Sequence, residues 1–185
     1  MTILTVLKAA DVAARWHADQ RRKGAAGEPY VNHLLEVAAL VAEADQDNTD
    51  LVVAALLHDA IEDQKIPREM IAEQFGERVA GLVDEATDDK SLPKEVRKQL
   101  QIQTASKKSR DAKLLKLADK ISNLRSIAAS PPAHWPIWRR RTYIDWSVAV
   151  VTAGLLGVSD WLDEQFVVAR KLAELSIPEE AGEAV

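Results

Sequence analysis

The chain contains no cysteine among its 185 residues. Disulfides, thiolate metal ligands and a thiol nucleophile are therefore excluded, and any metal must be held by histidine and carboxylate side chains. A cysteine-free chain is typical of the cell interior, and segment 1–16 lacks the basic run, apolar stretch and cleavage site of a signal peptide. We therefore expect a cytoplasmic protein.

Long apolar runs and an excess of positive charge are also missing. The longest apolar run, about Val148–Val158, is too short to cross the ~30 Å hydrocarbon core of a bilayer. The formal net charge is −5 and the pI is about 5.4, whereas nucleic-acid-binding proteins usually present a basic face to phosphates. We expect neither a membrane nor a nucleic acid as partner, and a small anionic substrate would need a local cationic pocket.

Apolar residues recur at spacings of three and four almost throughout, without sustained two-residue alternation. This pattern predicts an all-α protein of about nine helices, and the length with 47% hydrophobic residues predicts a single domain over 1–185. The helices are expected at about residues 5–22, 30–44, 51–63, 67–75, 76–86, 93 onward, 112–128, 137–156 and 160–175.

Two segments are expected to lie outside the helices. The basic stretch KKSRDAK, 107–113, is expected to interrupt the helical pattern as a mobile loop. The sequence does not decide whether this loop closes over a substrate. The acidic tail, about 178–185, is expected to be frayed.

The segment HDAIED, 58–63, directly continues the apolar run VVAALL. On one helix, His58 and Glu62 lie a turn apart, as do Asp59 and Asp63. A solvated helix end is one interpretation, but carboxylates are disfavoured at a helix C-terminus, and burying such groups without partners costs several kcal/mol. A divalent metal bound by His58 and Asp59 would satisfy them together, with Glu62 and Asp63 placed to move the proton of a bound water.

Two further ligand candidates are ambiguous from the residues alone. A lone histidine such as His33 is more often a hydrogen-bonded core residue than a ligand. In 112–128 the polar residues face away from the leucine stripe, and periodicity slightly favours a solvated face over a cleft-lining helix. These polar residues are Lys116, Asp119, Asn123 and Ser126.

Two histidines and two aspartates would make a mixed nitrogen and oxygen site for one ion, which suits Mn²⁺ better than Fe²⁺, Zn²⁺ or Mg²⁺. The basic cluster 21–23 with Tyr30 is equally compatible with phosphate and nucleobase contacts and with a solvated helix end. His17 and His134 are interpreted as structural. The tryptophans at 135, 138, 146 and 161 are interpreted as core or interface residues.

The order His33, His58-Asp59, Asp119 resembles the HD superfamily of metal-dependent phosphohydrolases. Four segments over about residues 10–160 resemble more narrowly the hydrolase domain of RelA/SpoT-type alarmone enzymes. They read RRKGAAGEPYVNH, AALLHDAIED, FGERVAGLVDEATDDKSLPKE and AKLLKLADKISNLR. Since no room remains for synthetase and regulatory domains, the chain is similar to stand-alone small alarmone hydrolases such as the metazoan SpoT homologue.

The resemblance implies a Mn²⁺-dependent hydrolase that removes the 3′-pyrophosphate of ppGpp or pppGpp, giving GDP or GTP, in the stringent response. It implies that His33, His58, Asp59 and Asp119 bind the metal and that Glu62 and Asp63 are catalytic. The substrate positions that it implies are Arg22, Lys23, Tyr30, Lys94, Asn123, Arg139 and Tyr143.

Departures from the family pattern and alternative functions remain. Ser126 stands where many members have Thr or Asp, and 136–138 is less polar than usual. An HD phosphatase acting on the 2′-phosphate of NADPH or on another nucleotide is one alternative, and a non-catalytic nucleotide-sensing module is another. The sequence also leaves open a homo-oligomer.

Overall fold

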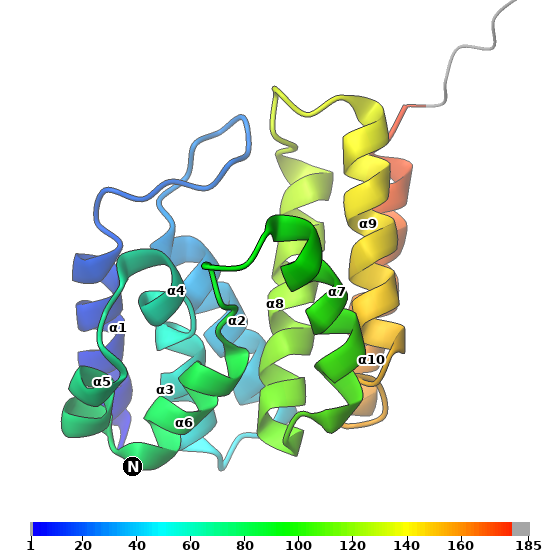
Figure 1. Ribbon diagram of the computed structural model, residues 1–185. Coiled ribbons are helices and arrows are strands. Elements are labelled where there is room, and N and C mark those ends of the chain that lie inside the picture. Colours follow the sequence, from blue (N-terminus) through cyan, green and yellow to red (C-terminus); the bar gives the residue numbers. More distant parts are fainter. Residues whose placement is uncertain (1, 179–185) are drawn as a thin grey trace, which may run out of the picture.

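The computed structural model describes residues 2–178 and is a bundle of α-helices (Figure 1). Within this range the only β pairing is an isolated bridge between Arg21 and Pro29. The helices are α1 (Ile3–Trp16), α2 (Val31–Ala44), α3 (Thr49–Leu57), α4 (Ala60–Gln64), α5 (Arg68–Phe75), α6 (Glu77–Ala86), α7 (Lys94–Thr104), the 3₁₀ turn η1 (Ala105–Lys107), α8 (Arg110–Ala129), α9 (Ile137–Thr152) and α10 (Asp160–Leu175). The all-α prediction with about nine helices is confirmed, α4 being one extra turn. Apart from residue 178, the tail predicted to fray lies outside the described residues.

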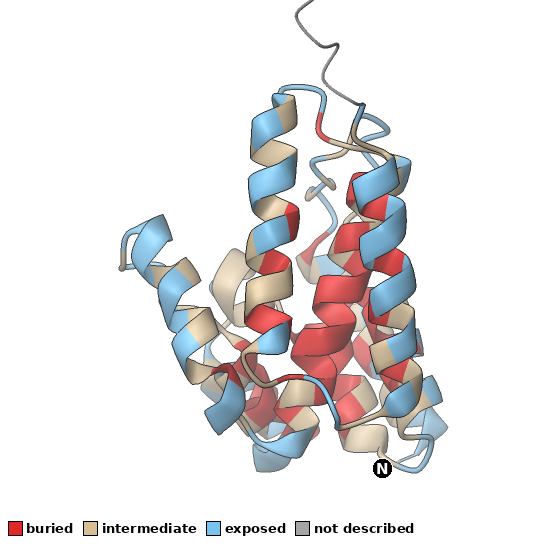
Figure 2. Cartoon of the chain, turned by 90° about the vertical axis from the view of Figure 1, so that its right-hand side faces the viewer, coloured by how far each residue is buried: buried red, intermediate tan, exposed pale blue. Residues whose placement is uncertain are grey.

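Helix α8 forms the centre of the bundle, with α2, α3 and α6 on one side and α9 and α10 on the other (Figure 1). Buried residues line the inner faces of the helices, whereas the outer faces are exposed (Figure 2). Burial on α8 extends around the helix and includes Lys116, Asp119, Lys120 and Ser122. The interpretation of its polar side as an ordinary solvated face is therefore wrong, and the alternative holds, because Lys116, Asp119, Asn123 and Ser126 line a cavity.

The predicted helix over 51–63 is broken in the structure. Helix α3 ends at Leu57 and α4 begins at Ala60, because Asp59 adopts φ −97° and ψ 0°, outside the helical region. The ring of His58 donates from Nδ1 to the carbonyl of Ala55 at 2.8 Å. That carbonyl is the acceptor that the N–H of Asp59 would use in a continuous helix. His58 and Asp59 thus lie at a turn rather than inside a helix.

Segment 107–113 is not one mobile loop. Ser109 caps α8 by accepting from the N–H of Ala112 at 3.2 Å, so 110–113 forms the first turn of that helix. Lys108 donates to the carbonyl of Glu85 at 2.6 Å, and Ser109 donates to the Glu85 carboxylate at 2.6 and 2.7 Å. These bonds fix the segment against the end of α6.

Two other predicted helices end early. Helix α1 ends at Trp16 rather than near residue 22, since the following residues turn inward and Arg21 pairs with Pro29. Helix α9 ends at Thr152 rather than near 156, before Gly154 at φ 147°. In the described part of the chain no helix combines the length and apolarity that crossing a bilayer requires.

The close packing of Gly154 predicts opposite effects for two glycine substitutions. A Cβ at Gly154 would lie 2.5 Å from the Cα of Ser106, and its φ is unfavourable for other residues, so Gly154→Ala should lower the free energy of unfolding by about 2 kcal/mol. Gly81 lies within α6 with open space around it, so Gly81→Ala should raise it by roughly 0.5–1 kcal/mol. Urea unfolding measures both, and equal stability of Gly154→Ala and the unchanged protein would contradict the packing described.

Candidate active site

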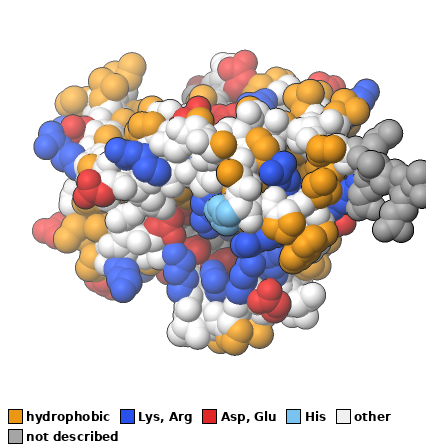
Figure 3. All heavy atoms as spheres, turned by 90° about the horizontal axis from the view of Figure 1, so that it is seen from above, with side chains coloured by type: hydrophobic (Ala, Val, Ile, Leu, Met, Phe, Trp, Pro, Cys, Tyr) orange, Lys and Arg blue, Asp and Glu red, His pale blue; other side chains and the backbone are white. Residues whose placement is uncertain are grey.

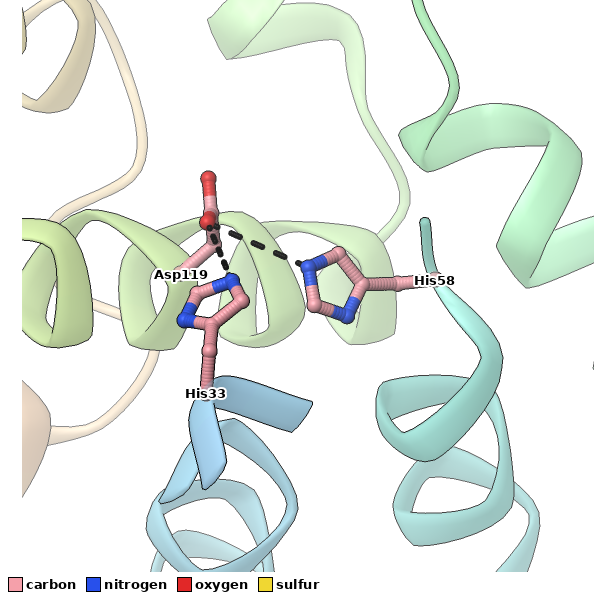
Figure 4. Close-up of side chains that lie close together, drawn as sticks. All are labelled: His33, His58 and Asp119. Atoms are coloured by element: carbon pink, nitrogen blue, oxygen red, sulfur yellow. Dashed lines mark ion pairs between the residues drawn. The ribbon is translucent and has the colours of Figure 1, made fainter. Parts of the chain in front are cut away.

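Three segments bring imidazoles and carboxylates together beside the middle of α8 (Figure 4). His33 comes from the first turn of α2, His58 from the end of α3, and Asp119 from α8. Asp119 Oδ1 lies 3.4 Å from His33 Nε2 and 3.9 Å from His58 Nε2. Asp59 Oδ2 lies 3.2 Å from His58 Nε2 and 3.7 Å from His33 Nε2. The structure therefore gathers all four predicted ligands.

The donor set fits a divalent metal ion. His33, His58 and Asp119 each offer one ligand atom, and these atoms lie within 4.8 Å of one another. His58 Nε2 is buried without a hydrogen-bond partner, although Asp59 lies close by. A buried polar nitrogen without a hydrogen-bond partner is costly, and a cation held jointly with the carboxylates would satisfy it. The geometry does not select one metal.

Burial and neighbouring charges shift the ionisation of this group. Burial lowers the pKa of His33. Burial also acts to lower the pKa of His58, but the charge and hydrogen bonding of Asp59, with the charge of Asp119, together outweigh it and raise this pKa to about 9. Burial acts to raise the pKa of Asp119, yet Lys120 and His33 outweigh it and hold this pKa well below its usual range. The carboxylates are therefore charged at neutral pH, and Lys120 and protonated His58 partly balance their charge in the metal-free protein.

Tyr30, predicted to contact substrate, supports this group from the side of α2. Its hydroxyl donates to Asp59 Oδ2 at 2.6 Å, and its ring stacks on His17 with centroids 5.3 Å apart. Burial and the charge of Asp59 raise the pKa of Tyr30, so that the hydroxyl remains a donor. The Arg22 guanidinium lies 5.8 Å from the centre of the same ring. Tyr30 thus orients a candidate ligand, and His17 supports Tyr30.

The acidic pair after α3 occupies two different environments. Asp63 accepts from Gln20 at 2.7 Å and from Lys90 at 2.5 Å. Glu62 accepts from the backbone N–H of Asp88 at 3.2 Å, and Lys90 Nζ lies 3.7 Å from it. Burial and the charge of Asp88 raise the pKa of Glu62. Glu62 is therefore more basic than an ordinary glutamate and suits a proton acceptor, while Asp63 is ion-paired with Lys90.

A cavity of about 460 Å³ opens above the carboxylates. It falls within the size range of small-molecule sites. Lys and Arg side chains gather on the face that carries the loops after α1 and α8 (Figure 3). The predicted residues that line the cavity are Arg22, Lys23, Tyr30, Asp59, Glu62, Asp63, Asp119, Asn123 and Tyr143. Asn123 also donates to Asp119 Oδ1 at 2.6 Å.

Two predicted substrate positions do not line this cavity. Lys94 is exposed on the first turn of α7. Arg139 lies with its guanidinium 4.5 Å from the centre of the Trp135 ring. Other cations line the cavity instead: Lys90, Arg97, Lys116 and Lys120. Lys116 belongs to the polar face for which a cleft-lining helix was the alternative interpretation, whereas the positions of Lys90, Arg97 and Lys120 were not predicted. For Lys120, its place next to Asp119 in the sequence was the available signal.

Aromatic rings form one wall of the cavity. Tyr143 lies between Trp135 and Trp146, with ring centroids 5.5 Å away on each side. Lys120 Nζ lies 4.4 Å from the centre of the Trp146 ring, a cation–π distance. Trp135 and Trp146 pack against the hydrophobic core, as predicted, but they also line the cavity, which the sequence did not predict. Trp138, by contrast, is exposed.

The sequence pattern of the HD domain family matches residues 9–143, which include all four candidate ligands. The chain belongs to the HD domain family. This HD domain is 45% identical over 161 residues to human guanosine-3′,5′-bis(diphosphate) 3′-pyrophosphohydrolase MESH1, covering 86% of this chain and 89% of that protein. The Drosophila melanogaster MESH1 is 44% identical over 140 residues, covering 75% and 78%.

A solved structure gives the same result for the fold. It belongs to a metazoan ortholog of SpoT described as hydrolysing ppGpp and acting in starvation responses. This HD domain superposes on it with a TM-score of 0.87 at 40% identity, covering 92% of this chain and 96% of that one. The family predicted from the order of motifs is confirmed.

The charge state of His58 predicts how the metal-free protein responds to pH. With a pKa of about 9 against 6.5 for the free side chain, protonated His58 should stabilise the fold fully below pH 6.5, and this stabilisation should be lost as pH rises through 9. Urea unfolding with a chelator, at about pH 6, pH 8 and pH 9.5, measures the decline. His58→Gln should abolish it, whereas His134→Gln, which changes an exposed histidine, should keep it. A decline of equal size in His58→Gln would contradict the assignment.

Proposed function

We propose that this HD domain is a Mn²⁺-dependent (p)ppGpp 3′-pyrophosphohydrolase, and that residues 1–185 fold as a single domain. One observation carries the proposal. His33, His58 and Asp119 form a buried group with the half-buried Asp59 beside both imidazoles, and this group adjoins a cation-lined cavity, in a chain 45% identical to a ppGpp pyrophosphohydrolase over 89% of that protein's length. The products would be GDP or GTP and pyrophosphate.

His33, His58, Asp59 and Asp119 are the residues that would hold the metal. Their mixture of imidazole nitrogen and carboxylate oxygen suits Mn²⁺. When bound, such an ion polarises a phosphoryl oxygen and lowers the pKa of a coordinated water. The turn at Asp59 supports this role, because it directs the consecutive side chains of His58 and Asp59 toward His33 and Asp119.

The cations around the cavity are proposed to bind the phosphates. Arg22 and Lys23 lie on one rim, and Lys90 and Arg97 lie on the α6–α7 side. Lys116 lies deeper, where it donates to the carbonyl of Ala86 at 3.1 Å. A nucleotide with diphosphates at both ribose ends presents two separated anionic groups, which cations on both sides can pair simultaneously.

The aromatic wall is proposed to hold the guanine. Trp135, Tyr143 and Trp146 line the same cavity as the acidic pair, and their rings lie side by side. Such rings bind a planar base by stacking, and each stacked base contributes about 1–3 kcal/mol. Binding the base there would set the 3′-diphosphate toward Asp59 and Asp119.

Within the acidic pair, Glu62 is proposed to transfer the protons during hydrolysis, and Asp63 is proposed to position neighbouring side chains. Glu62 takes a proton from the attacking water as its oxygen bonds to phosphorus. The bond between that phosphorus and the 3′ oxygen breaks, pyrophosphate leaves, and the 3′ oxygen takes up a proton. The raised pKa of Glu62 suits transfer in both directions. Asp63, bonded to Gln20 and Lys90, keeps those side chains in place.

A metal-resolved assay tests the proposed reaction. Purified protein, stripped of metal and resupplied with Mn²⁺, should convert ppGpp to GDP and pyrophosphate, and a chelator should stop the reaction. Comparing kcat/KM for ppGpp with that for NADPH and dAMP ranks the substrates, because discrimination lies in that ratio. Intact ppGpp after incubation with Mn²⁺, or a higher kcat/KM for NADPH, would contradict the proposal.

The proton-transfer role predicts the effect of one isosteric substitution. Glu62→Gln should lower kcat for ppGpp by about 10²–10⁴-fold, with little change in the free energy of unfolding. Glu69→Gln is the matched control, since Glu69 is exposed on α5. Steady-state kinetics at saturating Mn²⁺ measure both. Full activity of Glu62→Gln would exclude this residue as the proton acceptor.

A further inference from the structure

A chain of hydrogen bonds leads from His33 away from the cavity. His33 Nδ1 lies 2.8 Å from Ser122 Oγ, and Ser122 donates to Glu36 Oε2 at 2.6 Å. Arg125 donates to the other Glu36 oxygen at 3.0 Å and to Gln165 of α10 at 2.8 Å. The chain therefore joins α2, α8 and α10 behind the candidate metal group.

The direction of these bonds fixes the position of a hydrogen on His33. A carboxylate is only an acceptor, so the single hydroxyl hydrogen of Ser122 points to Glu36. The oxygen of Ser122 must then accept, and His33 donates to it from Nδ1. The lone pair of the neutral ring is consequently on Nε2, which lies 3.4 Å from Asp119 Oδ1. This tautomer is the one that can bind a metal between His33 and Asp119.

In the metal-free site, nearby carboxylates would also stabilise the opposite tautomer, in which the hydrogen of His33 is on Nε2. A hydrogen on His33 Nε2 would face the carboxylates of Asp119 and Asp59, at 3.4 and 3.7 Å. Such a hydrogen would occupy the position needed for a metal bond. His58 avoids this competition differently, since its Nδ1 donates to the backbone carbonyl of Ala55. His33 depends on side chains for the same result.

We propose that Ser122 and Glu36 are positioning residues that hold His33 with its hydrogen on Nδ1 and thereby strengthen metal binding. Ser122 is the critical link, because it is 1% exposed and contacts both His33 and Glu36. Glu36 supplies the negative charge, and Arg125 orients it. Partners that hydrogen-bond the second nitrogen of a ligand histidine typically change metal affinity by about 10–100-fold. The inference rests on the proposed metal site.

Mn²⁺ titration tests the effect on affinity. The electron paramagnetic resonance signal of free Mn²⁺ gives Kd without any substrate. Ser122→Ala should raise Kd by about 10–100-fold, and Ser122→Thr, which keeps the hydroxyl, should restore it. Ser147→Ala is the matched control, because Ser147 is a buried serine whose hydroxyl donates to the carbonyl of Tyr143 in its own helix.

A second variant, Glu36→Ala, tests the proposal independently if Ser122→Ala does not fold. The Glu36 side chain is 35% exposed, so Glu36→Ala should fold and still raise the Kd for Mn²⁺. Glu43→Ala, at an exposed position on the same helix, should leave it unchanged. Equal Kd values for Glu36→Ala and Glu43→Ala would overturn the proposal.

Nitrogen-15 NMR of the metal-free protein tests the tautomer itself. The chain has four histidines, so the imidazole signals can be assigned by substitution. His33 should carry its hydrogen on Nδ1 in the unchanged protein and on Nε2 in Ser122→Ala and Glu36→Ala. An unchanged tautomer in both variants, or an unchanged Kd, would overturn the proposal. If the unchanged protein does not bind Mn²⁺, the proposed metal site fails and with it the effect on affinity, while the NMR result still decides the tautomer.

Discussion

The structure depends on a carboxylate buried near the middle of the central helix α8. Asp119 lies on α8 where neighbouring helices exclude water, so its charge requires partners. His33 of α2 and Lys120 and Asn123 of α8 lie within 3.4 Å of its oxygens. His58 and Asp59 approach from the turn that ends α3. Satisfying one buried charge thus fixes the relative positions of several helices and assembles the site.

The proposed chemistry depends on which ionisable groups lie in which part of the cavity. The imidazoles lie beneath the carboxylates, the acidic pair lies at the side, and lysines and arginines surround the opening. An acidic protein can therefore bind a highly charged anion, because local placement of cations determines the field in a cleft more than net charge does. The aromatic wall from α9 and the preceding loop adds a surface for a planar base.

The sequence predicted the helical class, most helix positions, and the family from the order of its motifs. His58 and Asp59 stood out because charged residues directly continue an apolar run, whereas Asp119 did not. Periodicity assigns polar residues to solvent, and only tertiary packing shows that α8 is covered on that side as well. The break at Asp59 depends on the His58 ring taking the Ala55 carbonyl, a contact that no propensity scale contains. The cavity-facing tryptophans were missed because spacing cannot distinguish a core from a cavity wall.

The central claim is that one divalent ion is bound between α2, the α3–α4 turn and α8. Anomalous diffraction at the manganese edge, from crystals grown with Mn²⁺, tests it most directly. We expect one strong peak bonded to His33 Nε2, His58 Nε2, Asp59 and Asp119. A peak held instead by Glu62, Asp63 and Asp88, or a bond through the Nδ1 atom of either histidine, would contradict the account.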